Sequence, residues 1–183
     1  SLADQKKNGR WTVLFFYPAD FTFVCATEFE SLAEHQDHFK KLGCDIVTMS
    51  KDTKFTHLAW RTHEKELQNV KYLMGSDGKG EVAQLLGCYD DVSGLTLRGT
   101  YLISPTGTLT ASECNFYNVG RNVEELMRKF KANLYLSKKP TEVCPAKWKD
   151  EGDKTLTPGA RRVGKVYESL HGGDAPAKAA AKK

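Results

Sequence analysis

A continuous apolar run near the start of the chain constrains the fold more than any other feature. Residues 11–17, Trp-Thr-Val-Leu-Phe-Phe-Tyr, lie between Gly9 and Pro18 and are rich in aromatic and β-branched side chains. Such a run predicts a fully buried strand, and a strand of this kind belongs in the centre of a sheet that helices cover. We therefore expect an α/β protein built around residues 11–17.

The segments that follow alternate between helical and strand patterns. Helices are expected at about residues 24–42, 52–67, 82–86 and 122–136, and further strands at 44–50, 70–74, 99–103 and 108–114. Pro105 and Gly107 separate the last two strands and predict a hairpin. The order β-α-β-α-β-α-β-β-α predicts a mixed central sheet with helices on both faces. With a cysteine at the start of the first helix, this is the layout of a thioredoxin-like fold.

The chain changes character after residue 137. Residues 1–137 carry 16 Lys/Arg against 17 Asp/Glu, whereas residues 138–183 carry 11 against 6. We therefore expect a folded domain at 1–137, a C-terminal extension at 138–170 and a disordered basic tail at 171–183. A basic tail can bind nucleic acid, but no aromatic residue is interleaved with its last lysines, so we expect no such binding.

Several classes of protein do not fit the composition. The sequence contains no run of eighteen apolar residues, so no membrane span is predicted. The first seven residues lack the apolar stretch of a signal peptide, which predicts a cytoplasmic protein. The five cysteines include no C-x-x-C pair and no close Cys/His cluster that offers a zinc site. An odd number without an export signal argues against a disulfide-stapled secreted domain. We expect no metal and no other cofactor.

Packing in a core does not explain the position of Cys25. It follows the central strand and a short loop, and falls in the first turn of the first long helix. Unpaired backbone N–H groups and the positive end of the helix dipole stabilise an anion there. This matters because the thiolate is the reactive form of cysteine, whereas a free thiol is mostly protonated at neutral pH. Cys25 is therefore the candidate nucleophile.

The residues around Cys25 carry a family resemblance. Residues 15–28, Phe-Phe-Tyr-Pro-Ala-Asp-Phe-Thr-Phe-Val-Cys-Ala-Thr-Glu, closely resemble the active-site signature of two-cysteine peroxiredoxins. Residues 55–60 and 142–148 are similar to segments of the bacterial alkyl hydroperoxide reductase (AhpC) group, and the resemblance covers roughly residues 1–170. It implies a thiol peroxidase that reduces hydrogen peroxide and organic hydroperoxides. Ala26 departs from the family, which usually has proline there, and the family has a further N-terminal hairpin before the equivalent of Ser1.

The resemblance assigns roles to the residues that match. Cys25 attacks the peroxide, Pro18 shields it from water, and Thr22 accepts a hydrogen bond from the protonated peroxide while donating to another oxygen. Arg98 hydrogen-bonds both the thiolate and the peroxide. Arg121 helps to order Arg98.

Three further assignments complete the implied mechanism. Glu28 holds the two arginines in place, and Tyr17 flanks the pocket. Cys144, in the extension, resolves the oxidised cysteine by forming a disulfide with the partner subunit of a homodimer. The family also implies a decameric ring, and re-reduction by a thioredoxin-like protein or a flavoprotein disulfide reductase.

Alternatives remain for the other cysteines and for the function. Cys44, Cys88 and Cys114 are expected to be packing residues, although each could replace Cys144 as the resolving cysteine. A holdase chaperone that acts through oligomer surfaces is the second functional hypothesis. Peroxide consumption that depends on Cys25 separates the two.

Overall fold

The computed structural model describes residues 1–172 of the chain. It divides into two compact units, unit 1 (Ser1–Met127) and unit 2 (Arg128–Lys183). The division falls inside helix α5 (Val123–Lys138), so the domain boundary expected at residue 137 stays a prediction. Of the basic tail expected at 171–183, residues 173–183 lie outside the described part. Within residues 1–172, no helix is long and apolar enough to span a membrane.

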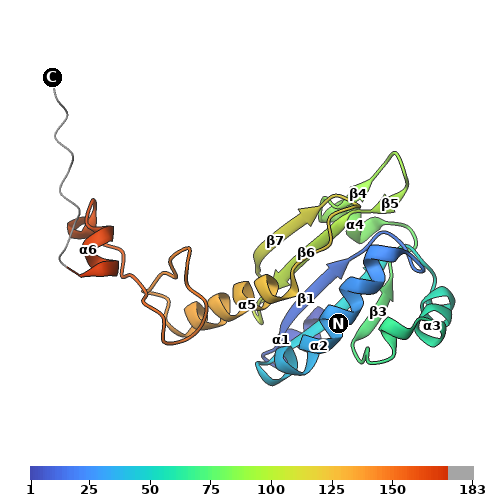
Figure 1. Cartoon of the computed structure of the whole chain (residues 1–183), viewed down its shortest axis with the longest axis horizontal. Coiled ribbons are helices and arrows are strands. Elements are labelled where there is room, and N and C mark those ends of the chain that lie inside the picture. Colours follow the sequence, from blue (N-terminus) through green and yellow to red (C-terminus); the bar gives the residue numbers. More distant parts are fainter. Residues whose placement is uncertain (173–183) are drawn as a thin grey trace. The chain divides into compact units, whose positions relative to one another are not determined.

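Unit 1 is built on a five-stranded mixed sheet with β1 (Trp11–Phe16) at its centre (Figure 1). The order is β3-β2-β1-β6-β7. β2 (Cys44–Ser50) and β3 (Leu73–Ser76) run parallel to β1. β6 (Arg98–Ile103) is antiparallel to both of its neighbours, β1 and β7 (Leu109–Asn115), so β7 again runs parallel to β1. The central position expected for residues 11–17 and the mixed sheet are confirmed.

Two sets of side chains leave the sheet on opposite faces, because successive residues of a strand alternate. The front face carries Val13, Phe15 and Thr100 and packs against α2 (Phe23–Lys41). Helix α2 buries the side chains that the helical pattern selected, namely Phe29, Leu32, Ala33 and Phe39.

The back face carries a second apolar cluster. Phe16 and Tyr101 meet there edge to face, with ring centroids 6.1 Å apart, and pack with Ala83 and Cys88. Ala83 belongs to α4 (Glu81–Leu85), so this short helix covers the back face. The two clusters sandwich the sheet, which fixes where residues 98 and 99 of β6 point.

The third strand begins later than expected, at Leu73 rather than Val70. The physical reason is Gln36 of α2, whose amide group takes the backbone hydrogen bonds that a strand would use. Its Oε1 accepts from the Lys71 N–H at 2.8 Å, and its Nε2 donates to the Asn69 carbonyl at 2.8 Å. The prediction of a strand at 70–74 was therefore wrong by three residues at its start.

The helix expected at residues 52–67 is shorter in the structure. Helix α3 (Lys54–His63) has Thr53 as its N-cap, and the Thr53 side chain accepts from the Thr56 N–H. Glu64 then adopts an extended conformation, and a 3₁₀ turn, η1 (Lys65–Leu67), follows.

Several elements were not anticipated. They are α1 (Leu2–Lys7), the β4–β5 pair (Tyr89–Asp90 and Leu95–Thr96), η2 (Ala160–Arg162) and α6 (Val166–His171). Helix α1 begins with a capping box in which Ser1 and Asp4 satisfy each other's backbone N–H groups. All four are short, so their periodic signals are weak.

Candidate functional site

Cys25 lies in the first turn of α2 and is completely buried. The loop from β1 delivers it there, and Thr22 occupies the N-cap position with an extended backbone. The first hydrogen bond of the helix runs from the Ala26 N–H to the Thr22 carbonyl at 3.2 Å. The N–H groups before Ala26 therefore have no helical carbonyl to bond, and they form a positive end beside the thiol.

Arg98 reaches Cys25 from the neighbouring part of the sheet. Its Nη1 lies 3.3 Å from the Cys25 Sγ and donates to Glu28 Oε2 at 2.7 Å. Its Nε donates to the Tyr117 carbonyl at 2.8 Å, which fixes the guanidinium from the other side. Arg98 is the first residue of β6 and points to the front face, so the strand itself aims this side chain at the thiol.

Glu28 joins Arg98 to a second arginine. Arg121 donates from Nε to Glu28 Oε1 and from Nη2 to Oε2, both at 2.9 Å, a bidentate pair. The Arg121 backbone N–H also donates to Oε1 at 2.9 Å. Arg121 Nη1 donates to the Gly99 carbonyl and to Thr100 Oγ1, each at 3.0 Å. Every nitrogen of this guanidinium therefore has a hydrogen-bond partner.

Arg121 also stacks on the core. Its guanidinium carbon lies 3.2 Å from the centre of the Phe15 ring, a close cation–π contact. Burial lowers the pKa of the Arg121 guanidinium, and the hydrogen bonds and charge of Glu28 oppose that effect. An arginine remains charged in either case.

The positive and negative charges in this cluster balance only if the Cys25 sulfur carries a negative charge. Arg98, Arg121 and Glu28 are all buried, and two guanidinium groups face a single carboxylate. A buried unpaired charge is costly. An anionic sulfur on Cys25 would supply the second negative charge, so the cluster is suited to hold a thiolate.

The loop before α2 holds two more of the expected residues. Pro18 is buried. Thr22 Oγ1 donates to the Ala19 carbonyl at 2.7 Å, which leaves its lone pairs free to accept a hydrogen bond. Phe21 has φ of 57°, a left-handed conformation that is uncommon outside glycine. This strained position bends the chain between Pro18 and the start of the helix.

Tyr17 lies beneath the loop in a network that the sequence did not reveal. Its hydroxyl donates to Asp20 Oδ1 at 2.6 Å. The other Asp20 oxygen lies 2.7 Å from His57 Nδ1, and His57 Nε2 lies 3.1 Å from the Gly75 carbonyl oxygen. Both ring nitrogens thus face acceptors, which suits a doubly protonated imidazolium.

The pKa of His57 follows from these contacts. Burial by itself lowers it, but the hydrogen bond and charge of Asp20, with the Gly75 carbonyl and the charge of Asp52, raise it above the ordinary 6.5. Burial and the Asp20 charge also raise the pKa of the Tyr17 phenol. Asp20 and His57 both lie within the segments that carry the family resemblance, and this was the available signal for them.

Cys144 belongs to unit 2, where its segment is held in a defined conformation. Val143, next to Cys144, forms an antiparallel bridge with Leu156. Trp148 is buried against Tyr135 of α5, with ring centroids 5.7 Å apart. Cys144 itself is partly exposed. Burial raises the pKa of its thiol, and the charge of Glu142 raises it further.

The remaining cysteines do not share the environment of Cys25. All five are free thiols. Burial raises the pKa of Cys44 to about 12, with the charge of Asp45 adding to it, and burial also raises the pKa of Cys88 and of Cys114. Within residues 1–172, no group of three or more His, Cys, Asp or Glu residues is arranged to hold a metal ion.

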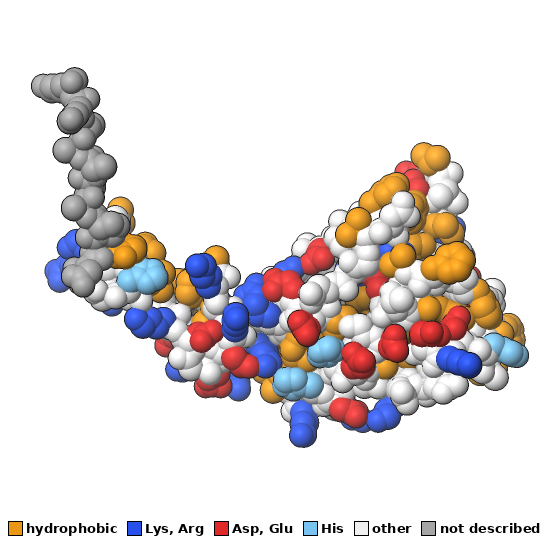
Figure 2. Space-filling view, in the orientation of Figure 1, with side chains coloured by type: hydrophobic (Ala, Val, Ile, Leu, Met, Phe, Trp, Pro, Cys, Tyr) orange, Lys and Arg blue, Asp and Glu red, His pale blue; other side chains and the backbone are white. Residues whose placement is uncertain are grey.

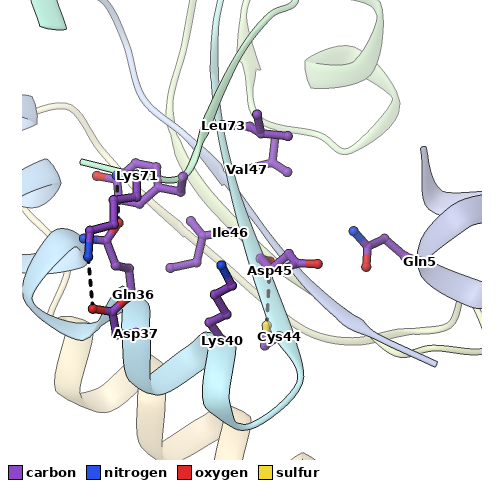
Figure 3. Close-up of a pocket in the computed structure, with 11 residues that line it drawn as sticks. Gln5, Gln36, Asp37, Lys40, Cys44, Asp45, Ile46, Val47, Lys71 and Leu73 are labelled. Carbon is purple, nitrogen blue, oxygen red and sulfur yellow. Dashed lines mark hydrogen bonds and ion pairs between the residues drawn. The ribbon is translucent and has the colours of Figure 1, made fainter. Parts of the chain in front are cut away.

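A cavity of about 210 Å³ lies near the other end of α2 (Figure 3). Gln36 and Lys40 of α2 line it together with Cys44, whose thiol is not activated, and the Lys71–Asp37 ion pair stands at its edge. It holds no arginine cluster and no residue of the signature. The candidate active site is therefore the group Cys25, Glu28, Arg98 and Arg121.

The fold and this group together define a class of protein. A buried cysteine at a helix N-terminus, next to a mixed sheet and two arginines, is the arrangement of a thiol-based redox enzyme. The comparisons with known proteins specify the class further.

The chain belongs to the AhpC/TSA family, whose model matches residues 1–112. It is 42% identical over 165 residues to alkyl hydroperoxide reductase C of Escherichia coli strain K12, covering 90% of this chain and 88% of that protein. It is 44% identical over 165 residues to alkyl hydroperoxide reductase C of Staphylococcus aureus strain Mu50, covering 90% and 87%.

Solved structures give the same answer. The crystal structure of Enterococcus faecalis AhpC matches with a TM-score of 0.73 and 38% identity, covering 75% of this chain and 82% of that one. The reduced 2-Cys peroxiredoxin of Plasmodium vivax matches with a TM-score of 0.78 and 30% identity, covering 85% and 82%. The expected thioredoxin-like fold and the expected family are confirmed.

Proposed function

We propose that this protein is a thiol-dependent peroxidase that reduces hydrogen peroxide and organic hydroperoxides. The observation that carries the proposal is the 3.3 Å contact between Arg98 Nη1 and Cys25 Sγ, in a cluster that Glu28 and Arg121 complete. Such a cluster holds an anionic nucleophile and can also bind the oxygen that becomes negative as a peroxide bond breaks.

The first step converts Cys25 to a sulfenic acid. The Cys25 thiolate attacks the terminal oxygen of the hydroperoxide, so an S–O bond forms as the O–O bond breaks, and the alkoxide or hydroxide leaves and takes up a proton. Thr22 accepts a hydrogen bond from the peroxide, since its own proton is already donated to the Ala19 carbonyl. Arg98 stabilises the departing oxygen. Pro18 and Tyr17 shape the pocket and keep water from the thiolate.

The second step uses Cys144 of the partner subunit in a homodimer. Its thiol condenses with the Cys25 sulfenic acid, which forms a disulfide and releases water. A dithiol reductant, either a thioredoxin-like protein or a flavoprotein disulfide reductase, then reduces the disulfide to two thiols and is itself oxidised to a disulfide. No bound metal, haem or flavin takes part in either step.

The surface of unit 1 supports association between subunits. Phe23, Phe55 and Leu58 are 94%, 71% and 65% exposed, and Figure 2 shows further hydrophobic side chains gathered over the β4–β5 pair. Exposed apolar patches of this kind mark sites of protein contact. The decameric ring and the cytoplasmic location rest on resemblance and sequence alone and stay predictions; light scattering of the reduced protein tests the ring.

Peroxide consumption by Cys25→Ser tests the proposal. Serine supplies no thiolate, so turnover with a dithiol reductant should fall to background, whereas Cys44→Ser should keep normal turnover because that thiol is buried and not activated. More than a few per cent of activity in Cys25→Ser would overturn the assignment.

A further inference from the structure

We propose that Cys88 and Cys114 form a second dithiol site, on the back face of the sheet, which closes to an intrachain disulfide. Arg98 points to the front face and contacts Cys25, and Gly99, the next residue of β6, therefore faces the back. The two sites are thus separated by the thickness of the sheet.

Gly99 makes room for the Cys88 thiol. A Cβ atom added to Gly99 would lie 2.9 Å from the Cys88 Cβ and 3.0 Å from its Sγ, closer than Cβ atoms normally approach other atoms. The Cε2 atom of Tyr101 would lie 2.8 Å from the same added atom, so Cys88 and the Tyr101 ring together occupy the space that a side chain at position 99 would fill. The requirement for glycine here comes from packing, and not from its backbone conformation.

Cys114 is the cross-strand neighbour of that same position. In the β6–β7 pairing, Gly99 stands directly opposite Cys114. The Gly99 N–H donates to the Leu97 carbonyl and the Gly99 carbonyl accepts from Arg121, so neither group is directed across to Cys114. Pairs of this non-hydrogen-bonded kind have Cα atoms about 4.5 Å apart, and their Cβ atoms point to the same face.

Because Cys88 and Cys114 both neighbour position 99, their side chains lie near each other on the back face. Cys88 fills the space at position 99 together with the Tyr101 ring, and Cys114 is the residue directly opposite position 99 on β7. A disulfide needs Cβ atoms about 3.8 Å apart. Rotation of the exposed Cys114 side chain, together with a small shift of the Cys88 loop, brings the sulfurs together.

The two thiols differ in a way that orders the chemistry. Cys114 is exposed, whereas Cys88 is completely buried. Burial raises the pKa of both thiols, and charge on Cys114 raises that of Cys88 further, as expected of neighbouring groups. Cys114 is therefore the sulfur that an outside reagent meets first, and Cys88 is the internal partner. Because the pKa of each thiol is raised, both react more slowly than an activated cysteine.

The oxidant that we assign to this site is a low-molecular-weight disulfide. The Cys114 thiolate attacks one sulfur of the reagent, which forms a mixed disulfide and releases one reagent thiol. The Cys88 thiolate then attacks the Cys114 sulfur, which forms the Cys88–Cys114 bond and releases the second reagent thiol. In total two protein thiols lose two electrons and two protons, and one small disulfide becomes two thiols.

The test uses the full-length chain with Cys25→Ser and Cys144→Ser, so that Cys44, Cys88 and Cys114 remain. The folded protein is incubated with glutathione disulfide, quenched with acid, alkylated under denaturing conditions and mapped by mass spectrometry. We expect two thiols to disappear without stable addition of glutathione, and the peptides that contain residues 88 and 114 to be joined. Cys44 is the internal control and should remain alkylatable.

Single replacements separate the two steps. Cys88→Ser in the same background should stop the reaction at a Cys114–glutathione mixed disulfide, and Cys114→Ser should leave Cys88 free. Two results in the parent protein would overturn the proposal. One is a stable Cys114–glutathione adduct beside a free Cys88, and the other is a covalent dimer joined through Cys114. The parent keeps both Cys88 and Cys114, so the decision does not depend on how Cys88→Ser or Cys114→Ser folds.

Discussion

Arg98 Nη1 lies 3.3 Å from the Sγ of Cys25, and both side chains are buried. Glu28 holds the same nitrogen at 2.7 Å, so the guanidinium is fixed between a carboxylate and the sulfur. The contact joins the start of β6 to the first turn of α2, through two residues that are 73 positions apart in sequence. A fixed positive charge of this kind serves catalysis because it needs no rearrangement when charge develops in the reaction.

Replacement of Arg98 by alanine should slow the first step. We expect the rate of Cys25 oxidation by hydrogen peroxide to fall by about 10²–10³-fold, the usual effect of removing one donor to developing charge. Single-turnover kinetics of the reduced protein measure this rate. Arg10→Ala is the matched control, because Arg10 pairs with Asp45 at the N-terminal ends of β1 and β2, whereas the loop to Cys25 leaves the C-terminal end of β1. Equal rates for the two variants would remove Arg98 from the mechanism.

Glu28→Gln should destabilise the folded protein. It would leave two buried guanidinium groups without a carboxylate, and breaking a buried ion pair in this way costs about 3–5 kcal/mol. Urea unfolding followed by circular dichroism measures the change in the free energy of unfolding. Glu30→Gln, on the exposed side of the same helix, should change it little. A difference within error between the two variants would contradict the charge argument.

The pair of His57 and Asp20 should make stability depend on pH. The pKa of His57 is raised above 6.5 in the folded protein, so folding favours the protonated ring. This contribution is fully present below pH 6.5 and is lost as the pH rises through the folded value.

His57→Gln should flatten the dependence of the free energy of unfolding on pH just above 6.5, the ordinary pKa of histidine. His63→Gln, at an exposed position, is the control and should keep the slope of the wild type. The prediction is wrong if both variants show the same slope.

Glu142→Gln should make Cys144 a faster nucleophile. Glu142 raises the pKa of the Cys144 thiol by its charge, in addition to the effect of burial, and it is itself kept ionised because Thr155 and Tyr135 donate to it and lower its pKa. Removal of the charge should lower the pKa of Cys144 and speed its alkylation by iodoacetamide at neutral pH. Glu151→Gln provides the exposed control on the same segment. An unchanged rate would show that burial alone sets the reactivity.

The sequence predicted an element best where the residues of that element alone determine its structure. The strand expected at residues 44–50 matches β2 with correct bounds, and the apolar run placed β1 at the centre. The Cys25 cluster could be predicted because a short signature and two isolated arginines match a family. What the family could not supply is the geometry, for example the stacking of Arg121 on Phe15.

The misses have physical reasons. The start of β3 depends on Gln36, a residue of another element, so no reading of residues 70–74 alone could find it. The Asp20–His57 pair joins residues that are 37 positions apart. In the extension, Trp148 and the Val143–Leu156 bridge order a segment for which the sequence predicted no structure, because one buried aromatic side chain can anchor a polar loop.

The most direct test of the central claim is disulfide mapping after one equivalent of hydrogen peroxide. Reduced wild-type protein is treated, quenched with acid, alkylated and digested without reductant. We predict that the peptides containing Cys25 and Cys144 are joined by a disulfide, and that a covalent dimer forms on non-reducing electrophoresis. The account is contradicted if Cys25 stays fully alkylatable after the peroxide has been consumed, or if its disulfide partner is Cys44, Cys88 or Cys114.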